Sequence, residues 1–508
     1  MRQHAIKILL ASSIVWPLHC WSDTTGTNPL YQKHCAACHG AQRLGGIGPA
    51  LLPQNLSRLK PEVAREVISG GRTLTQMPAF GEQLSASEIA DLTDYIYRAP
   101  TQTPSWSLDD IRASQIVHYP QGSLDDKPVF EADLQNLFVV VELGDHHATI
   151  LDGDKFEPIH RFKTRYALHG GPKYTSDGRY VFFASRDGWI SKFDMYKLKI
   201  VAEVRAGINT RNAAVSFNNK YVAVGNYLPH NLVILSAEDL SPIVSLPMAN
   251  KAGKTSRVSA VYTAPPRNSF IVALKDIPEI REIPYDNIEV GKTVTMHTLT
   301  MTDYMDDFFF NQDYSVVMGA ARPAGSGKSA AGISGKVIDL NSGEKLADLA
   351  IPGMPHLGSG ISWNYQGRPV MATPNLNNGK VSVIDMETWQ VVKTLDTLGP
   401  GFFMRSHSQS PYAWVDVFFG PHKDKVHVFD KETLALVKTL TPEPGKTAAH
   451  VEFTRDGKYA LLSIWDNDGA VIVYDANTLE EIKRLPMSKP SGKYNVYNKT
   501  HYDAGTSH

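Results

Sequence analysis

The chain has 508 residues, of which 42% are hydrophobic and 20% charged, and its 51 basic and 52 acidic residues give a net charge of −1. This composition excludes a disordered or fibrous chain, and the length suffices for at least two domains of about 100–200 residues each. The near-neutral charge argues against nucleic acid as a partner, because binding to phosphates requires a surplus of cations. Three cysteines are too few for a disulfide scaffold.

The first 22 residues are typical of an export signal. Arg2 and Lys7 precede a short apolar run over residues 8–16. We therefore expect residues 1–22 to be removed and the mature protein to lie in the periplasm. Cys20 leaves a lipid anchor as an alternative, although the two residues before it are unusual for lipidation. No later segment has about 18 consecutive apolar residues, so we expect no membrane span.

A haem-attachment motif follows, with Cys35 and Cys38 separated by two residues and His39 directly after them. Thiols at this spacing bond to both vinyl groups of one haem, and the adjacent imidazole becomes an axial ligand of its iron. A zinc knuckle or a redox dithiol would need a second ligand pair or a thioredoxin-like context, and neither is visible. We therefore predict one covalent haem c, with His39 as an iron ligand.

The second axial ligand of this haem is expected from Met77, which a proline follows. A lone methionine is more often a core residue, but the spacing of Met77 from the attachment motif favours ligation. A capping box that begins at Ser85 predicts an amphipathic helix after it. We predict an all-α cytochrome c domain over residues 23–100, whose function is electron transfer, and a linker over residues 101–114.

The remaining residues, 115–508, show a repeat of about 45 residues, which is typical of one four-stranded propeller blade. Eight strand-like runs recur behind turn signals: residues 138–141, 180–183, 221–224, 270–273, 314–317, 370–372, 413–416 and 459–462. Closure into a ring removes the free sheet edges that an open array would expose. We predict an all-β, eight-bladed propeller, closed by pairing of residues 494–497 with residues 117–119.

Four histidines fall just before or at the start of predicted blades: His169, His356, His407 and His450. Any one of them is more often an ordinary core or surface residue than a ligand. Four at equivalent positions, beside a c-type electron carrier, indicate a second redox centre at the mouth of the central channel.

Cationic side chains occupy the same loops as these histidines. Any single one is as often an ordinary solvated charge, but together they suit a ligand with several carboxylates, such as a tetrapyrrole. Two aromatic residues, Tyr227 and Trp465, are predicted to line the same pocket, with packing in the core as the alternative. The cationic residues are Arg165, Lys173, Arg186, Arg211 and Arg405.

With these motifs, the chain resembles the cytochrome cd1 family, in which a cytochrome c domain precedes an eight-bladed propeller that holds haem d1. The resemblance covers nearly all of the mature chain, and its most specific segments are residues 166–169, 185–187, 355–356, 403–407 and 492–498. It implies that His169 is the proximal ligand of the haem d1 iron and that His356 and His407 are the distal pair. It also implies that Arg165, Lys173, Arg186 and Arg211 bind the carboxylates of haem d1.

The family includes two activities: reduction of nitrite to nitric oxide, and oxidation of a propionate of dihydro-haem d1 to an acrylate in the last step of haem d1 biosynthesis. The short segment before the haem-attachment motif and the additional His450 make this chain more similar to the dehydrogenase. For this activity we expect His450 or His356 to act as the base. We expect the electrons to pass singly to the ferric iron of the substrate and to haem c, a periplasmic acceptor to reoxidise the protein, and the nitrite reductase to receive the product. Nitrite reduction and non-catalytic carriage of haem d1 are the alternatives.

Overall fold

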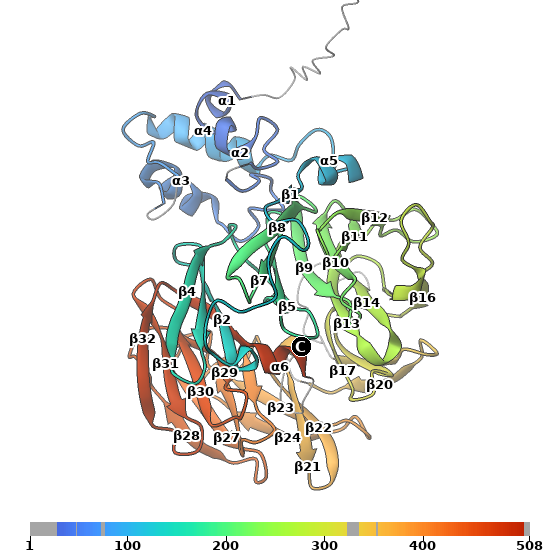
Figure 1. Ribbon diagram of the computed structural model, residues 1–508, viewed down its shortest axis with the longest axis vertical. Coiled ribbons are helices and arrows are strands. Elements are labelled where there is room, and N and C mark those ends of the chain that lie inside the picture. Colours follow the sequence, from blue (N-terminus) through green and yellow to red (C-terminus); the bar gives the residue numbers. More distant parts are fainter. Residues whose placement is uncertain (1–27, 47, 73–76, 323–334, 352–353, 502–508) are drawn as a thin grey trace, which may run out of the picture.

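The computed structural model describes residues 28–46, 48–72, 77–322, 335–351 and 354–501. The predicted export signal, residues 1–22, lies outside this part of the chain. The described residues form a helical domain, followed by eight antiparallel sheets in an eight-bladed propeller (Figure 1). The predicted order of an all-α and an all-β domain is therefore confirmed.

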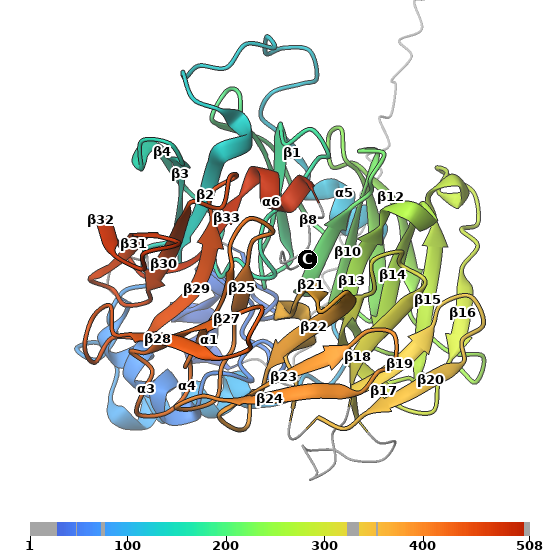
Figure 2. The same ribbon diagram turned by 90° about the horizontal axis from the view of Figure 1, so that it is seen from below.

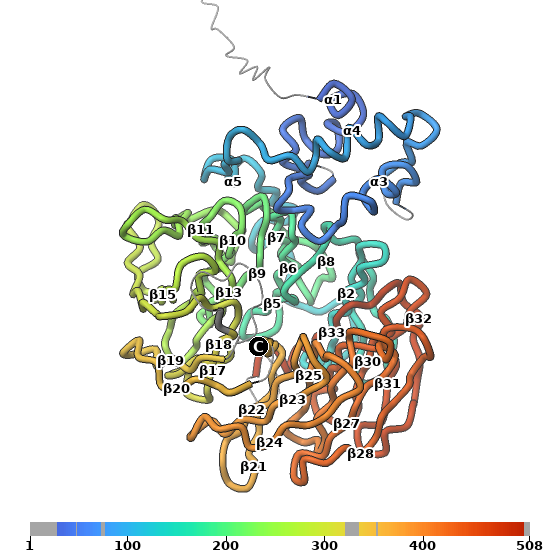
Figure 3. The backbone as a smooth tube through the Cα atoms, turned by 180° about the vertical axis from the view of Figure 1, so that it is seen from behind, coloured from blue at the N-terminus to red at the C-terminus, as the bar shows by residue number. Residues whose placement is uncertain are grey.

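The helical domain contains α1 (Pro29–His34), α2 (Ala36–His39), α3 (Pro61–Gly70) and α4 (Ala86–Tyr97), and α5 (Leu108–Ala113) precedes the propeller. The capping box predicted at Ser85 is present, since its hydroxyl accepts from the backbone N–H of Glu88 and the Glu88 carboxylate accepts from the backbone N–H of Ser85. The two domains lie next to each other in opposite views (Figures 1 and 3).

Seven of the eight sheets have four strands and one has five, because the short strand β1 (Ile116–Val117) adds to its outer edge; in all but the blade of the C-terminal strand β33 (Pro490–Asn495), the four blade strands follow one another in the chain from the innermost outward. The first four blades are β5 (Lys173–Tyr174), β6 (Tyr180–Ala184), β7 (Trp189–Asp194), β8 (Lys199–Arg205); β9 (Asn209–Val215), β10 (Tyr221–Leu228), β11 (Asn231–Ser236), β12 (Pro242–Pro247); β13 (Val258–Ala264), β14 (Ser269–Leu274), β15 (Glu279–Pro284), β16 (His297–Thr300); and β17 (Tyr304–Phe310), β18 (Val316–Arg322), β19 (Gly335–Asp339), β20 (Lys345–Leu349).

The other four blades are β21 (Ile361–Tyr365), β22 (Arg368–Pro374), β23 (Lys380–Asp385), β24 (Val391–Asp396); β25 (Met404–Ser406), β26 (Tyr412–Asp416), β27 (Val426–Asp430), β28 (Leu436–Leu440); β29 (Ala448–Phe453), β30 (Tyr459–Ile464), β31 (Gly469–Asp475), β32 (Glu481–Met487); and β33 (Pro490–Asn495), β2 (Leu137–Glu142), β3 (His147–Asp152), β4 (Glu157–Lys163). The short elements are β1 (Ile116–Val117), η1 (Leu134–Asn136), η2 (Pro265–Arg267), η3 (Tyr285–Asn287), η4 (Leu357–Ser359) and α6 (Val496–Thr500).

The ring is closed by a different strand from the one predicted. The C-terminal strand β33 pairs with β2, with Tyr494 opposite Val139. Residues 116 and 117 form β1 instead, which adds to the outer edge of β8 with Ile116 opposite Glu203. The predicted pairing of residues 494–497 with 117–119 was therefore wrong, although the sheet is still closed by joining the two ends of the repeat region.

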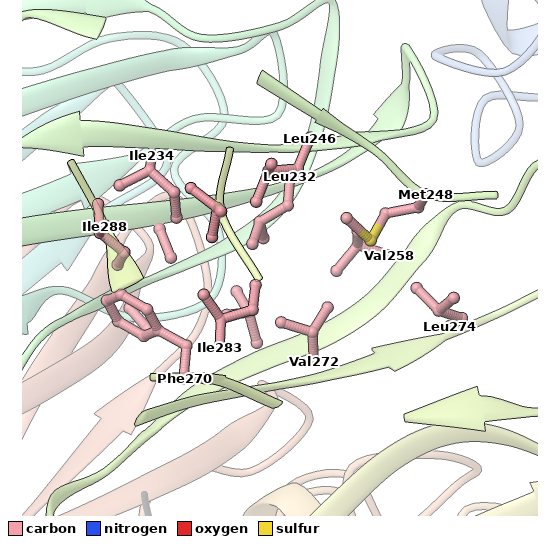
Figure 4. Packing of buried hydrophobic residues seen from close by; sticks show 14 of the residues in the cluster. Leu232, Ile234, Leu246, Met248, Val258, Phe270, Val272, Leu274, Ile283 and Ile288 are labelled. Atoms are coloured by element: carbon pink, nitrogen blue, oxygen red, sulfur yellow. The ribbon is translucent and has the colours of Figure 1, made fainter. Parts of the chain in front are cut away.

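Apolar side chains from neighbouring blades fill the space between the sheets. In Figure 4, Leu232 and Ile234 of β11 lie opposite Phe270 and Val272 of β14, and all four are completely buried. Burial of one such side chain contributes about 1.5–3 kcal/mol. This packing makes the ring a rigid support for the loops at its two ends.

The antiparallel order of the strands sorts these loops into two groups (Figure 2). One end of the ring carries the loops that precede the innermost strands and the loops that join second to third strands. We call it the helix-side end, because residues 44–55 of the helical domain contact it. Turns that follow the innermost strands emerge at the opposite end. Among the helices of the described residues, none has the length and apolar character needed to cross a membrane.

Candidate functional site

The haem-attachment motif lies at the junction of α1 and α2. His39 is 7% exposed, and its Nδ1 donates to the backbone oxygen of Pro49 at 2.8 Å. Gly48 lies against the ring, so closely that a Cβ there would be 2.6 Å from Cε1 of His39. A proton held on Nδ1 leaves the Nε2 lone pair available, which is the form of imidazole that binds a metal.

The other predicted haem ligands join the same part of the domain. Burial, with a contribution from Cys38, raises the pKa of the Cys35 thiol to about 11. Met77 and Cys35 both pack against the apolar cluster of the helical domain, which includes Leu56 and Ile68. Cys35 and Met77 beside this cluster, with Cys38 and His39 in α2 directly after Cys35, make up the donor set that a c-type haem requires.

The segment that follows the motif also holds the two domains together. Arg205, at the end of β8, donates to the carbonyl of Leu44 and stacks on Trp106, whose indole N–H donates to the Arg205 carbonyl at 2.8 Å. Asn55 donates to the carbonyl of Ile208 at 3.0 Å. The loop that orients His39 is therefore in direct contact with the helix-side end of the propeller.

His169 lies in the loop before β5, at this same end. Its Nδ1 donates to the carbonyl of Arg211 at 2.8 Å. Its Nε2 accepts from Arg186 at 2.8 Å and from Arg211 at 3.1 Å. Burial, together with these two arginines, holds the pKa of His169 well below its usual range. His169 is thus neutral, with its lone pair on Nε2 and its orientation fixed by a backbone oxygen.

Carboxylates balance the cations around His169 only in part. Asp307 opposes the effect of burial on the pKa of Lys173, and, against the effect of burial, Asp307 and Asp306 with Tyr227 raise the pKa of Arg211. Burial, with repulsion from Arg211 and Arg58, lowers the pKa of Arg186 to about 9. Burial also lowers the pKa of Lys173 to about 8, and the ammonium group, which lies 5.9 Å from the centroid of the Tyr262 ring, makes no hydrogen bond to another residue that the structure describes. Tyr227 partly offsets the lowering of the Arg186 pKa, so Tyr227 lies near these cations. Such a surplus of buried positive charge favours an anionic ligand.

Arg58 was not predicted from the sequence, because nothing in its neighbourhood distinguishes it from an ordinary solvated arginine. It belongs to the helical domain, yet it lowers the pKa of both His169 and Arg186. The helical domain therefore contributes charge to a cluster that otherwise comes from the propeller.

His356 lies in the loop before β21, also at the helix-side end. Its Nδ1 donates to the carbonyl of Phe402 at 2.6 Å, and its Nε2 has no hydrogen-bond partner among the described residues. Burial lowers the pKa of His356, and Arg211, which binds His169, adds to this lowering. His356 therefore presents a neutral nitrogen with a free lone pair within electrostatic range of the His169 cluster.

His450 is part of β29 and is 6% exposed. Its ring lies 4.8 Å from that of Phe403 and 5.1 Å from that of Tyr494, between centroids. Its Nδ1 is buried without a hydrogen-bond partner. Burial, with repulsion from Lys493 and Arg405, holds the pKa of His450 well below its usual range. A buried imidazole nitrogen without a partner is rare in a pure structural role.

Aromatic rings connect the two histidines. Phe402 lies 4.2 Å from His356 and 5.1 Å from Phe418, whose ring is 5.0 Å from Trp465. The indole nitrogen of Trp465 is buried and has no hydrogen-bond partner among the described residues. Side chains from three blades thus form one aromatic surface. Trp465 was predicted from the sequence to line the pocket, whereas the phenylalanine pairs at 402–403 and 418–419 were not.

His407 does not join this group. It follows β25 rather than preceding it, so it emerges at the opposite end of the propeller. It is 2% exposed, packs against Gly457, and its carbonyl accepts from Lys431 at 2.9 Å. The prediction that His407 forms a distal pair with His356 is therefore corrected.

Two of the predicted cations are also paired within the protein. Arg165 makes two hydrogen bonds of 2.8 Å to Glu203 on the outer strand β8 and stacks on Trp189. Arg405 donates to Glu452 at 2.8 Å, and both side chains are buried. Both arginines are therefore held by carboxylates of the chain itself, and their binding of ligand carboxylates stays a prediction.

Two family models match the chain. The Cytochrome D1 heme domain model matches residues 132–499, and the Cytochrome C oxidase, cbb3-type, subunit III model matches residues 23–96. The helical domain is accordingly a cytochrome c domain.

Curated relatives match along almost the full length. A dihydro-heme d1 dehydrogenase of Pseudomonas aeruginosa is 59% identical, covering 94% of this chain and 95% of the relative. A nitrite reductase of Stutzerimonas stutzeri is 26% identical, covering 94% of this chain and 93% of the relative. A solved structure, dihydro-heme d1 dehydrogenase NirN in complex with DHE, is 58% identical with a TM-score of 0.89, covering 93% of this chain and 99% of the other.

Proposed function

Because this chain belongs to the Cytochrome D1 heme domain family, we propose that it is a dihydro-haem d1 dehydrogenase, which oxidises a propionate side chain of its tetrapyrrole substrate to an acrylate. The observation that carries the proposal is its similarity to the P. aeruginosa dehydrogenase over nearly the whole chain. The solved relative in complex with DHE supports the same class of ligand.

His169 and the cations beside it bind the substrate. The neutral Nε2 of His169 is the iron ligand, and Arg186 and Arg211, which donate to that nitrogen in the free protein, turn to the substrate carboxylates. Lys173 adds a third cation. Tyr227, beside these cations, and Trp465, beside the aromatic surface, line the pocket. Binding of a polycarboxylate relieves the repulsion among the cations, so charge complementarity contributes to affinity.

The base is His450 or His356, since both are neutral and both keep a nitrogen without a hydrogen-bond partner. Conversion of CH2–CH2 to CH=CH breaks two C–H bonds and releases two protons and two electrons. One proton passes to the imidazole of the base, and the second is released to solvent. A neutral imidazole in a dry site is suited to such an abstraction.

Cys35 and Cys38 would hold haem c through their thiols, and His39 and Met77 would supply the two further donors to its iron, since His39 keeps Nε2 free and Met77 packs beside Cys35. When bound, haem c would supply an acceptor for one of the two electrons, and the ferric iron of the substrate would take the other. The chain's own contribution is the contact between the segment after His39 and the strands β8 and β9, because it fixes the two halves of the enzyme relative to each other.

The enzyme acts in the periplasm after export, and a periplasmic electron acceptor reoxidises it. The cytochrome cd1 nitrite reductase is the recipient of the finished haem d1. Residues 1–22, whose sequence supports export, precede the described part of the chain.

Anaerobic incubation of the purified protein with dihydro-haem d1 and an electron acceptor tests the proposal. We expect the absorption spectrum of the macrocycle to change to that of haem d1. Binding without conversion would identify a carrier. Release of nitric oxide from nitrite, at a rate typical of a respiratory enzyme, would identify a nitrite reductase instead.

A further inference from the structure

The backbone at His450 departs from the regular ladder of its sheet. Ala449 pairs with Ser463 and Val451 pairs with Leu462, so His450 is an extra residue without a partner in β30. Its φ is 55°, in the left-handed region that residues other than glycine seldom adopt. Such a conformation persists only where surrounding groups hold it in place.

Two charged side chains supply the contacts that the ladder omits. The backbone N–H of His450 donates to Oδ2 of Asp416 at 3.2 Å. The backbone oxygen of His450 accepts from Lys493, which also donates to Ser463 at 2.9 Å. Asp416 is 1% exposed and Lys493 is completely buried. Both polar groups of the His450 backbone are therefore held by buried side chains from other strands.

The same carboxylate also holds the loop that orients His356. Oδ1 of Asp416 accepts from the backbone N–H of Phe402 at 2.8 Å and of Phe403 at 3.0 Å. The carbonyl of Phe402 in turn accepts from Nδ1 of His356. One oxygen of Asp416 thus serves the His356 side of the site, and the other serves the His450 side.

We propose that Asp416 is the positioning residue of this site, which fixes His450 directly and His356 through Phe402. This inference rests on the proposed function, in which one of these histidines accepts the proton. An ionised carboxylate suits the role because it has two acceptor oxygens and no donor, so it serves three N–H groups from both directions at once. No asparagine can do so, because its NH2 group would face a donor on one side. Burial raises the pKa of Asp416 to about 7, and the three N–H groups and Lys493 oppose this rise by favouring the ionised form.

The variant Asp416→Asn tests the inference in the purified holoprotein. We expect kcat to fall by about a hundredfold, because a small misplacement of a base is enough for such a loss. The dissociation constant for dihydro-haem d1, titrated by absorbance, should stay within about threefold, because His169 and its arginines lie on other blades. The absorption spectrum of haem c should not change.

Asp385→Asn is the matched control. Asp385 is 5% exposed and accepts from the backbone N–H groups of Glu387 and Thr388, both at 2.8 Å, in the turn after β23 at the opposite end of the propeller. The Asp385→Asn variant should lose about as much stability as Asp416→Asn and keep the kcat of the unaltered enzyme. An Asp416→Asn enzyme with the kcat of the control would overturn the inference.

A crystal structure of the Asp416→Asn protein gives a readout that does not depend on turnover. We expect His450 to leave the left-handed region or the Phe402–Phe403 loop to move. If both stay in place, Asp416 is not the positioning residue. If they move but the unaltered protein never converts dihydro-haem d1, the positioning role stands and the proposed activity fails.

Discussion

Replacement of Arg186 by glutamine should make the substrate-free protein more stable and the substrate complex weaker. Burial, with repulsion from Arg211 and Arg58, lowers the pKa of Arg186 from 12.5 to about 9. At about 1.4 kcal/mol for each pKa unit, the charged side chain costs the folded protein at most about 5 kcal/mol. Because the folded-state pKa is the lower one, this cost is fully present below pH 9 and disappears as the pH rises from about 9 to 12.5.

Glutamine removes the charge but keeps an N–H donor for Nε2 of His169. Water and structural relaxation reduce the full cost, so we expect the free energy of unfolding to rise by about 1–3 kcal/mol at pH 7. The dissociation constant for dihydro-haem d1 should rise by about 10- to 100-fold, since a hydrogen bond to a charged group contributes about 1.5–3 kcal/mol. Urea unfolding of the substrate-free protein and an absorbance titration measure the two effects.

Arg161→Gln is the control, because Arg161 on β4 donates to Glu142 at 3.0 Å and to Asp145, within the blade formed by β33, β2, β3 and β4. Loss of these partners should lower stability and leave substrate affinity unchanged. If Arg186→Gln lowers stability as Arg161→Gln does, or leaves the dissociation constant unaltered, the view of Arg186 as an uncompensated substrate-binding cation is wrong.

Three other predictions concern the histidines and haem c. His450→Ala should lower kcat by about 10²- to 10⁴-fold while the substrate still binds; steady-state turnover equal to that of the unaltered enzyme would leave His356 as the base. Met77→Ala should shift the reduction potential of haem c in a spectroelectrochemical titration, and an unshifted potential would mean that another residue ligates the iron. The pKa values of His169 and His450 in the folded protein lie well below the usual 6.5. As the pH falls below 6.5, these two imidazoles therefore bind protons in the unfolded chain but not in the folded protein. Below pH 6.5 the free energy of unfolding should therefore fall by up to about 1.4 kcal/mol per pH unit for each histidine, and equal stability in urea at pH 7.5 and 5.5 would contradict their buried, neutral state.

Local patterns in the sequence predicted those parts of the fold that depend on near neighbours. The capping box at Ser85 needs contacts only three residues apart, and the eight strand-like runs fall in or beside the second strands of the eight blades. Closure of the ring was mispredicted, because residues 116–117 and residues 137–142 are both extended and nothing local distinguishes which of them meets β33.

The site was predicted less completely than the fold for a similar reason. His407 lies only three residues beyond the start of β25, and a shift of that size carries a side chain to the other end of a short strand. Arg165 is held by Glu203, which is 38 residues away in the chain. Asp416 ends a strand like many other aspartates, and only the folded ring shows that the Phe402 loop and His450 converge on it.

The most direct test of the central claim is a single turnover without an external acceptor. Oxidised protein is mixed anaerobically with ferric dihydro-haem d1, so that haem c and the substrate iron can each take one of the two electrons, and the absorbance of haem c and of the macrocycle is followed in the same stopped-flow experiment. We predict that haem c is reduced with the same rate constant as haem d1 appears, and that His450→Ala slows both. Formation of haem d1 while haem c stays oxidised, or tight binding with neither change, would contradict the proposal that the two domains form one dehydrogenase.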